Sequence, residues 1–224
     1  IIQIANGILI GGEGGGGGVI PFSGLLDAYP GASAAYSVRQ LSSTYTAPTA
    51  SEFSFGNALQ FDGSNDYVDF SSISFSGDFT ISTWVKFDSF GYVIMADANI
   101  NFYLFTENST AIRLSIGTTG VAPDRLVFTV PTMTTETWYY LTISRISNSV
   151  RLYLNSVESS TLAITSSNTF NLNRWSGYGS AGFDFFGVID EALISNTTGA
   201  TQQNVTDLYN SGNGALASDI IASP

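Results

Sequence analysis

Short apolar runs that alternate with polar positions dominate the chain beyond Thr46, and Gly, Asn, Asp and Ser residues separate one run from the next. Alternation with a period of two places the apolar side chains on one face of an extended strand. The pattern therefore predicts an all-β fold, a many-stranded antiparallel sandwich with little helix. Three sets of apolar residues are the expected core layers: Phe79, Ile81, Val85 and Phe87; Tyr139, Leu141 and Ile143; Leu152 and Leu154.

Two local features depart from simple alternation. Trp84 falls on the opposite parity from the apolar residues of its own run, which predicts either a bulge or a second covered face. Near the end of the chain, residues 201–210 are typical of a short helix, and the following Ser-Gly-Asn-Gly, residues 211–214, is typical of its stop.

The first 50 residues differ from the rest and form a predicted N-terminal arm, residues 1–50. Residues 1–10 are apolar but lack a basic flank and are too short to cross a bilayer, so we expect neither a signal peptide nor a membrane span. Residues 11–18 contain seven glycines and Glu13. They form either a flexible linker or a close-packed passage between neighbouring subunits. Residues 22–45 predict one or two short helical turns broken by Pro30 and Gly31.

Composition and charge narrow the class of protein. A chain of 224 residues with 44% hydrophobic and 13% aromatic residues suffices for one large sandwich, which we place at residues 51–214, followed by a tail at 215–224. A formal charge of −11 disfavours a nucleic-acid partner. Because cysteine is absent, disulfides and thiolate metal sites are excluded.

Five passages, taken in order, resemble the laminin-G-like jelly rolls of the concanavalin A-like superfamily. They are Ala58–Asp69, Phe79–Val85, Trp138–Ile143, Val150–Asn155 and Phe186–Ile194, and the resemblance covers Phe53 to Gly214. It implies a jelly-roll domain that serves as a binding or spacing module of surface, secreted or viral proteins. Where such domains have an Asn-Gly hairpin, this chain has Asn155-Ser156, so we expect a different turn.

The lack of histidine and the spacing of the acidic residues disfavour catalysis. Histidine is absent, which removes Ser-His, Cys-His and His-metal chemistry. In glycoside hydrolases of this superfamily the catalytic acids lie two residues apart on one strand, whereas Asp190 and Glu191 are adjacent and so point to opposite faces. Only a loop contribution from Asp62, Asp66 or Asp184 would support a hydrolase. We therefore expect a protein that is not an enzyme.

The resemblance also implies a calcium ion at the rim of the sandwich. Asp190 shares its strand parity with Val188, Ala192 and Ile194, so its charge is costly unless it is hydrogen-bonded or binds a cation. Asp62 lies in the Phe-Asp-Gly turn of a strand expected to pair nearby, and oxygen ligands suit Ca²⁺. The alternative is that both carboxylates make only local hydrogen bonds.

The best candidate for ligand binding is the segment 171–186. Its polar and aromatic residues lie among glycines, as in loops that stack on sugar rings. The candidate residues are Asn173, Arg174, Trp175 and Tyr178, with Phe183 beside them. The alternative is that Trp175 closes the end of the core or forms an intersubunit contact.

A second resemblance concerns the arm. Residues 23–45 look like segments near the N-terminus of bacteriophage tail-associated and other virion proteins. This implies a structural or adhesive virion component, such as a tail, fibre or capsid-decoration protein, assembled in the host cytoplasm. It would join other virion proteins or copies of itself through residues 1–50, as a homo-oligomer, and could contact a host-surface glycan. The alternative is a carbohydrate-binding module of a cell-surface or secreted protein, in an extracellular location.

Overall fold

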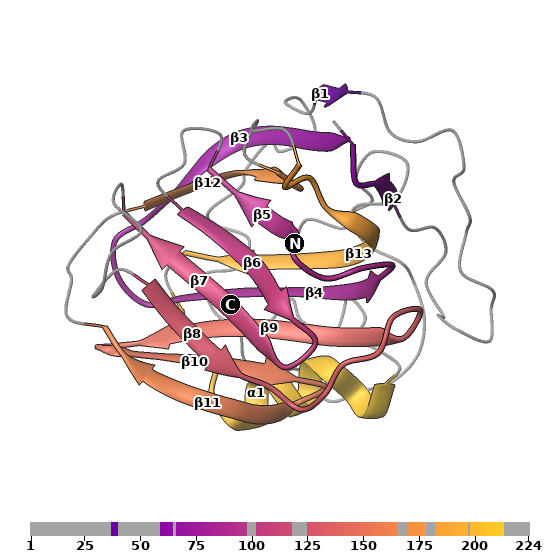
Figure 1. The fold of residues 1–224 in the computed structure, drawn as a ribbon. Helices are drawn as coiled ribbons and strands as arrows, with labels where there is room; N and C mark the ends of the chain where they lie inside the picture. Colours follow the sequence, from indigo (N-terminus) through magenta and orange to yellow (C-terminus); the bar gives the residue numbers. More distant parts are fainter. Residues whose placement is uncertain are drawn as a thin grey trace, which may run out of the picture.

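The computed structural model describes residues 37–39, 59–64, 66–97, 102–117, 125–164, 170–177, 182–196 and 198–212. Two antiparallel sheets face each other as a sandwich (Figure 1). The seven-stranded sheet has the order β1 (Ser37–Arg39), β3 (Tyr67–Phe75), β12 (Phe170–Trp175), β5 (Val93–Ala96), β6 (Phe102–Asn108), β7 (Ala111–Ile116) and β8 (Arg125–Thr129). The six-stranded sheet has the order β11 (Val157–Ala163), β10 (Ser149–Leu154), β9 (Trp138–Ile146), β4 (Phe79–Phe87), β13 (Phe186–Ser195) and β2 (Leu59–Asp62). The predicted all-β jelly-roll sandwich is confirmed.

The inner core lies between the two sheets. Every residue of the three predicted core layers is buried there, which confirms the strand parity read from the sequence. Aromatic rings from both sheets meet at its centre, where the Phe170 ring stacks on Phe75 with centroids 4.7 Å apart and on Phe102 with centroids 4.5 Å apart. The Phe79 ring meets both Phe75 and Phe170 edge-on. These contacts fix the spacing of the sheets.

A second apolar layer covers the outer face of the six-stranded sheet. Helix α1 (Gln202–Tyr209) lies beside β11 (Figure 1). Its residues Val205 and Leu208 are buried in one cluster with Trp84 and Tyr140. Trp84 therefore has the opposite parity because its face is covered too, and the predicted second covered face is confirmed. The helix begins at a reciprocal cap, in which the Thr201 N–H donates to Asn204 Oδ1 over 2.9 Å. It is followed by residues with positive φ, as the stop signal predicts.

The turn between β10 and β11 differs from the expectation. Asn155 and Ser156 both have positive φ, 51° and 63°, which is the geometry of the two-residue turn that Asn-Gly sequences adopt. The prediction of a different turn was wrong. Hydrogen bonds hold the turn without glycine: the Tyr140 N–H donates to Asn155 Oδ1 over 2.8 Å, and Gln202 Nε2 donates to the Ser156 carbonyl over 2.6 Å.

The arm is described only at Ser37–Arg39. This segment is a strand paired with Tyr67–Asp69, where helical turns were predicted, so that prediction was wrong for these three residues. Pairing with the edge of a sheet satisfies backbone groups that a single helical turn leaves open. The glycine passage, the remainder of the arm and the tail at 215–224 lie outside the described residues. None of the helices in the described part of the chain is long and apolar enough to span a bilayer.

Candidate functional site

The outward face of the seven-stranded sheet carries rings and charges in two cross-strand rows. In the first row Tyr103, Ser115 and Arg125 are opposite one another on β6, β7 and β8. In the second row Phe105, Arg113 and Val127 are opposite one another on the same strands. Their neighbours Leu104, Ile112, Leu114, Leu126 and Phe128 are in the inner core, so the two rows point outward. With Glu107 and Phe183 added to Tyr103, Phe105, Arg113 and Arg125, we call these six residues the outer-face cluster.

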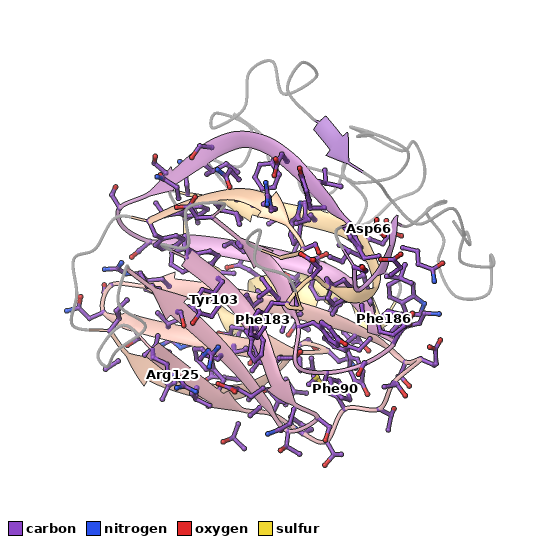
Figure 2. The ribbon with its side chains drawn as sticks, turned by 45° about the horizontal axis from the view of Figure 1, so that its top comes forward. Asp66, Phe90, Tyr103, Arg125, Phe183 and Phe186 are labelled. Carbon is purple, nitrogen blue, oxygen red and sulfur yellow. The ribbon has the colours of Figure 1, made fainter. Side chains whose placement is uncertain are left out.

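Aromatic rings form the apolar part of the cluster. The Arg113 guanidinium lies over the Phe105 ring, 4.6 Å from its centroid, and over the Tyr103 ring at 5.2 Å. Phe183, on the segment before β13, is 39% exposed and has its ring centroid 6.1 Å from that of Phe105. The Val93 N–H donates to the Phe183 carbonyl over 2.9 Å, which holds this segment against β5. Phe105 is therefore the buried support, Phe183 is exposed, and Tyr103 is half-buried, with the Arg113 guanidinium over its ring. Figure 2 labels Tyr103 and Phe183.

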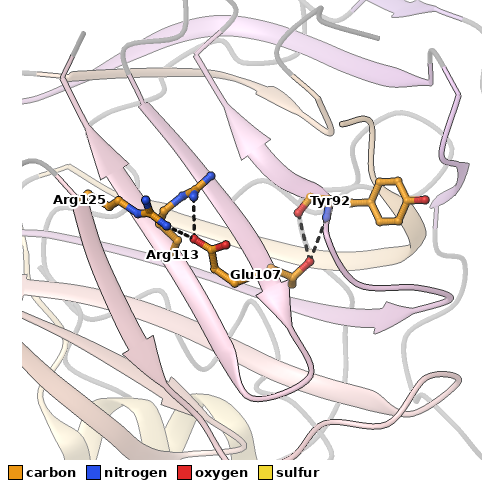
Figure 3. Close-up of polar contacts among 5 residues, drawn as sticks. Tyr92, Glu107, Arg113 and Arg125 are labelled. Atoms are coloured by element: carbon orange, nitrogen blue, oxygen red, sulfur yellow. Dashed lines mark hydrogen bonds and ion pairs between the residues drawn. The ribbon is translucent and has the colours of Figure 1, made fainter. Parts of the chain in front are cut away.

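One carboxylate joins the two arginines of the cluster. Oε1 of Glu107 accepts from Arg113 Nη1 and from Arg125 Nη2, each over 2.6 Å (Figure 3). The Arg125 side chain is 43% exposed, against 16% for Arg113. Two guanidinium groups thus share one carboxylate oxygen, which holds them in fixed positions beside the rings. Arg125 presents the accessible part of this charge.

Arg174, a predicted ligand residue, is engaged within the protein. Its guanidinium binds Asp69 in a bidentate pair, Nε to Oδ1 at 2.5 Å and Nη2 to Oδ2 at 2.9 Å. It also lies 3.9 Å from the centroid of the Tyr67 ring. The residue is only 9% exposed. Its donors stabilise β3 against β12 rather than facing a ligand.

Trp175 is buried in the inner core with 0% exposure, 6.3 Å from the Phe70 ring. A ring buried in this way has no free face, so it does not stack on a sugar as predicted. The structure agrees instead with the alternative, in which Trp175 closes the core. Asn173 is half-buried on the same strand, and Tyr178 lies outside the described residues. Of the segment named from the sequence, Phe183 is the residue that joins the outer-face cluster.

The two carboxylates of the predicted metal site are not adjacent. In the pairing of β2 with β13, Asp62 is opposite Phe186, four residues before Asp190. At about 3.3 Å per residue this separates their backbones by roughly 13 Å. Asp62 is exposed, and its Oδ1 accepts from the Ser64 N–H over 2.8 Å. Over the described ranges no group of three or more acidic, His or Cys side chains could hold a metal. A calcium ion therefore stays a prediction, without support from the pairing of Asp62 with Asp190.

The surroundings of Asp190 also differ from the predicted parity. Asp190 is 2% exposed and is opposite Trp84, whose side chain belongs to the layer under α1. Between Asp190 and Leu193 the pairing with β4 shifts by one residue. Ala192 and Ile194 therefore belong to the inner core rather than to the face of Asp190. A bulge of this kind does not show in the alternation of the sequence.

A carboxyl pair lies at the end of β4. Burial raises the pKa of Asp88 to about 6, and a hydrogen bond with Glu136 and the charge of that residue add to the rise, while Lys86 opposes it. Lys86 Nζ forms an ion pair with Glu136 Oε2 at 3.2 Å. Below about pH 6, a proton on Asp88 and the ammonium group of Lys86 together reduce the negative charge at this end of the sheet.

This pair predicts a pH dependence of stability. The pKa of Asp88 in the folded protein, about 6, exceeds the ordinary value of 3.8. The stabilisation of the folded state that protonated Asp88 contributes is therefore fully present below about pH 4 and is lost as pH rises through 6. We expect Asp88→Asn to raise the free energy of unfolding at pH 7.5 by about 1 kcal/mol, less than the full shift implies because Asp88 is partly exposed. Urea unfolding at pH 4 and 7.5 measures this. A variant whose stability changes with pH as steeply as the parent would contradict it.

Comparison with known proteins identifies the family. A laminin G family model, described as the Concanavalin A-like lectin/glucanases superfamily, matches residues 62–205. The chain therefore belongs to the laminin G-like domains of this superfamily, as the sequence resemblance implies. No curated protein matches it significantly in sequence.

Solved structures share the fold at low sequence identity. Domain 4 of AbnA, a GH43 extracellular arabinanase from Geobacillus stearothermophilus in complex with arabinotriose, is 18% identical, with a TM-score of 0.55 over 77% of this chain and 85% of that one. The ligand-binding domain of botulinum neurotoxin serotype D, in complex with N-acetylneuraminic acid, is 16% identical, with a TM-score of 0.57 over 78% of this chain and 46% of that one. Trypanosoma rangeli sialidase is 11% identical, with a TM-score of 0.50 over 68% of this chain and 27% of that one. The chain thus spans less than half the length of the last two.

Proposed function

We propose that this domain is a non-enzymatic, lectin-like module that binds carbohydrate on the outward face of its seven-stranded sheet. The observation that carries the proposal is the outer-face cluster, in which accessible rings lie beside fixed charged groups. Aromatic faces pack against the C–H faces of sugar rings, and a few oriented polar groups bind the hydroxyls. Phe183 and Tyr103 supply the first kind of contact, and Arg125 with Glu107 supplies the second.

Two of the similar structures support a carbohydrate ligand. The arabinanase domain is in complex with an arabino-oligosaccharide and the neurotoxin domain with a sialic acid. At these identities the likeness concerns the fold alone, so no residue of theirs is transferred to this chain. The support is that two domains with the same sandwich fold are in complex with sugars, and that the outer-face cluster of this chain has side chains suited to binding one.

The carboxylates favour binding over hydrolysis. Asp66 and Asp184, the predicted loop contributors, are 0% and 7% exposed. Glu107 is bound by two arginines. A glycoside hydrolase is therefore the weaker hypothesis, although the sialidase shows that enzymes also contain this fold.

The virion role is a separate prediction. It depends on residues 1–50, of which only Ser37–Arg39 is described. A displayed domain of a virion and a module of a cell-surface protein would both use a glycan-binding face, so the proposal holds for either location. The virion protein differs from the cell-surface module in one respect: it would attach through the arm to copies of the chain or to other virion proteins.

A glycan array followed by calorimetry tests the proposed function. For a glycan that binds, we expect Phe183→Ala and Tyr103→Ala each to weaken binding by about tenfold or more, as truncation of an aromatic contact residue does. The control is Val157→Ala, which removes an apolar side chain that is 61% exposed on the other sheet. An array without any bound glycan, or equal losses in all three variants, would overturn the proposal.

A further inference from the structure

We propose that the ligand of the outer-face cluster is an anionic glycan, with a sugar-borne carboxylate or sulfate held by Arg125 and backed by Arg113. This inference rests on the proposed function and adds the chemical class of the ligand.

Basic residues are scarce in this chain, and three of the seven, Arg113, Arg125 and Arg174, lie on the same sheet. The formal charge is −11, with seven basic and 18 acidic residues. Arg113, Arg125 and Arg174 all lie on the outward side of the seven-stranded sheet, where their described ion-pair partners are Glu107 and Asp69. These three arginines and two carboxylates together have a net charge of +1, in a protein that is otherwise acidic. Such a surface favours an anion at contact range, although the whole chain repels it at a distance.

The net positive charge of these five residues lies in the outer-face cluster rather than at Arg174. Arg174 has one carboxylate to itself in a bidentate pair. Arg113 and Arg125 instead share a single oxygen of Glu107, so each guanidinium keeps donors that this carboxylate does not occupy. Since the Arg125 side chain is 43% exposed, its remaining N–H groups can reach an incoming anion.

Two further polar groups of the same rows are short of partners. In the described part of the structure, Nε of Arg113 and Oγ of Ser115 are buried without a hydrogen-bond partner. Ser115 is opposite both Tyr103 and Arg125. Guanidinium and hydroxyl groups supply donors here, while one shared carboxylate is the main acceptor. The donors that an incoming ligand can reach are those of Arg125, and an anion accepts from them more strongly than a neutral hydroxyl does.

The position of the charge relative to the rings makes the ligand a sugar acid rather than a free anion. Arg113 lies over both Tyr103 and Phe105, and Phe183 lies beside Phe105. Arg125 is two strands away from Tyr103, a separation of roughly 10 Å, so an oligosaccharide whose acidic unit binds Arg125 reaches the Tyr103 ring with a neighbouring sugar unit. The rings and the charge act on one ligand.

Matched pairs of glycans test the inference on the full chain. Oligogalacturonate and its methyl ester differ in the carboxylate charge and one small methyl group per unit, and dextran sulfate and dextran differ only in sulfate. Together with the charged and neutral members of a glycan array, they separate the two sources of anion. We expect a charged member to bind at least tenfold more tightly than its neutral counterpart, and its affinity to fall between 50 and 200 mM salt.

Charge variants locate the effect. Arg125→Gln should weaken binding of the charged glycan by tenfold or more, and Arg125→Lys should restore part of it. The matched control is Arg151→Gln, which removes an arginine of the six-stranded sheet that is 29% exposed and paired with Glu158 at 3.8 Å, and should leave binding within twofold. Equal losses for Arg125→Gln and Arg151→Gln would overturn the inference. Binding to neutral glycans alone would overturn it but keep the proposed function, whereas binding to no glycan would overturn both.

Discussion

Replacing Phe79 with alanine is expected to lower the free energy of unfolding by about 3–5 kcal/mol, because it leaves a cavity at the centre of the sandwich. The ring is 0% exposed and meets Phe75 and Phe170 edge-on, with centroids 5.5 and 5.2 Å away. These rings belong to both sheets, so the surroundings cannot close over the space without changing the distance between the layers. Equilibrium unfolding in urea measures the loss.

The matched control is Phe183→Ala, the same substitution at a side chain that is 39% exposed. We expect it to cost less than about 1 kcal/mol, since much of that ring already contacts water. If Phe79→Ala also costs less than about 1 kcal/mol, then the strand parity and the inner core described here are incorrect.

The second large effect is expected from Asp69→Ala, which should cost about 2–3 kcal/mol. The substitution leaves the guanidinium of Arg174, a residue only 9% exposed, without its bidentate partner. An uncompensated buried charge is expensive, and the cost is below that of a fully buried pair because the Asp69 side chain is 32% exposed. Thermal and urea unfolding of the variant give the value.

Glu158→Ala serves as the comparison for this pair. Its partner Arg151 is 3.8 Å away, and both side chains are more exposed, at 37% and 29%. A pair of this kind contributes less than about 1 kcal/mol. A cost for Asp69→Ala that does not exceed the cost for Glu158→Ala would show that Arg174 is not held by Asp69, and would return Arg174 to the set of candidate ligand residues.

The fold could be predicted from the sequence because its signals are local. Alternation within each run fixes which residues face the core, and the inner core contains every residue that alternation assigned to it. Irregularities escaped this reasoning. The bulge after Asp190 changes parity without any mark in the sequence, and Ser156 adopts a positive φ because its hydrogen-bonded neighbours hold the turn.

The candidate site could be predicted only in part, because it depends on register between strands. The sequence marks Phe183 as an aromatic residue among glycines, but it does not mark Tyr103 and Phe105 as site residues. Their strand, Phe102–Asn108, has apolar residues at both parities, so the sequence does not show which rings point outward. Arg113 and Arg125 come next to these rings only through the pairing of β6, β7 and β8. The tryptophan that looked most like a sugar-stacking residue belongs instead to the core.

Backbone NMR during titration with a bound glycan tests the central claim most directly, because it locates the ligand without a substitution. We predict that the largest changes in amide chemical shift fall on β6, β7 and β8 around Tyr103 and Arg113 and on the segment that contains Phe183. Changes centred instead on α1 and the β10–β11 hairpin, with the seven-stranded sheet unaffected, would contradict it.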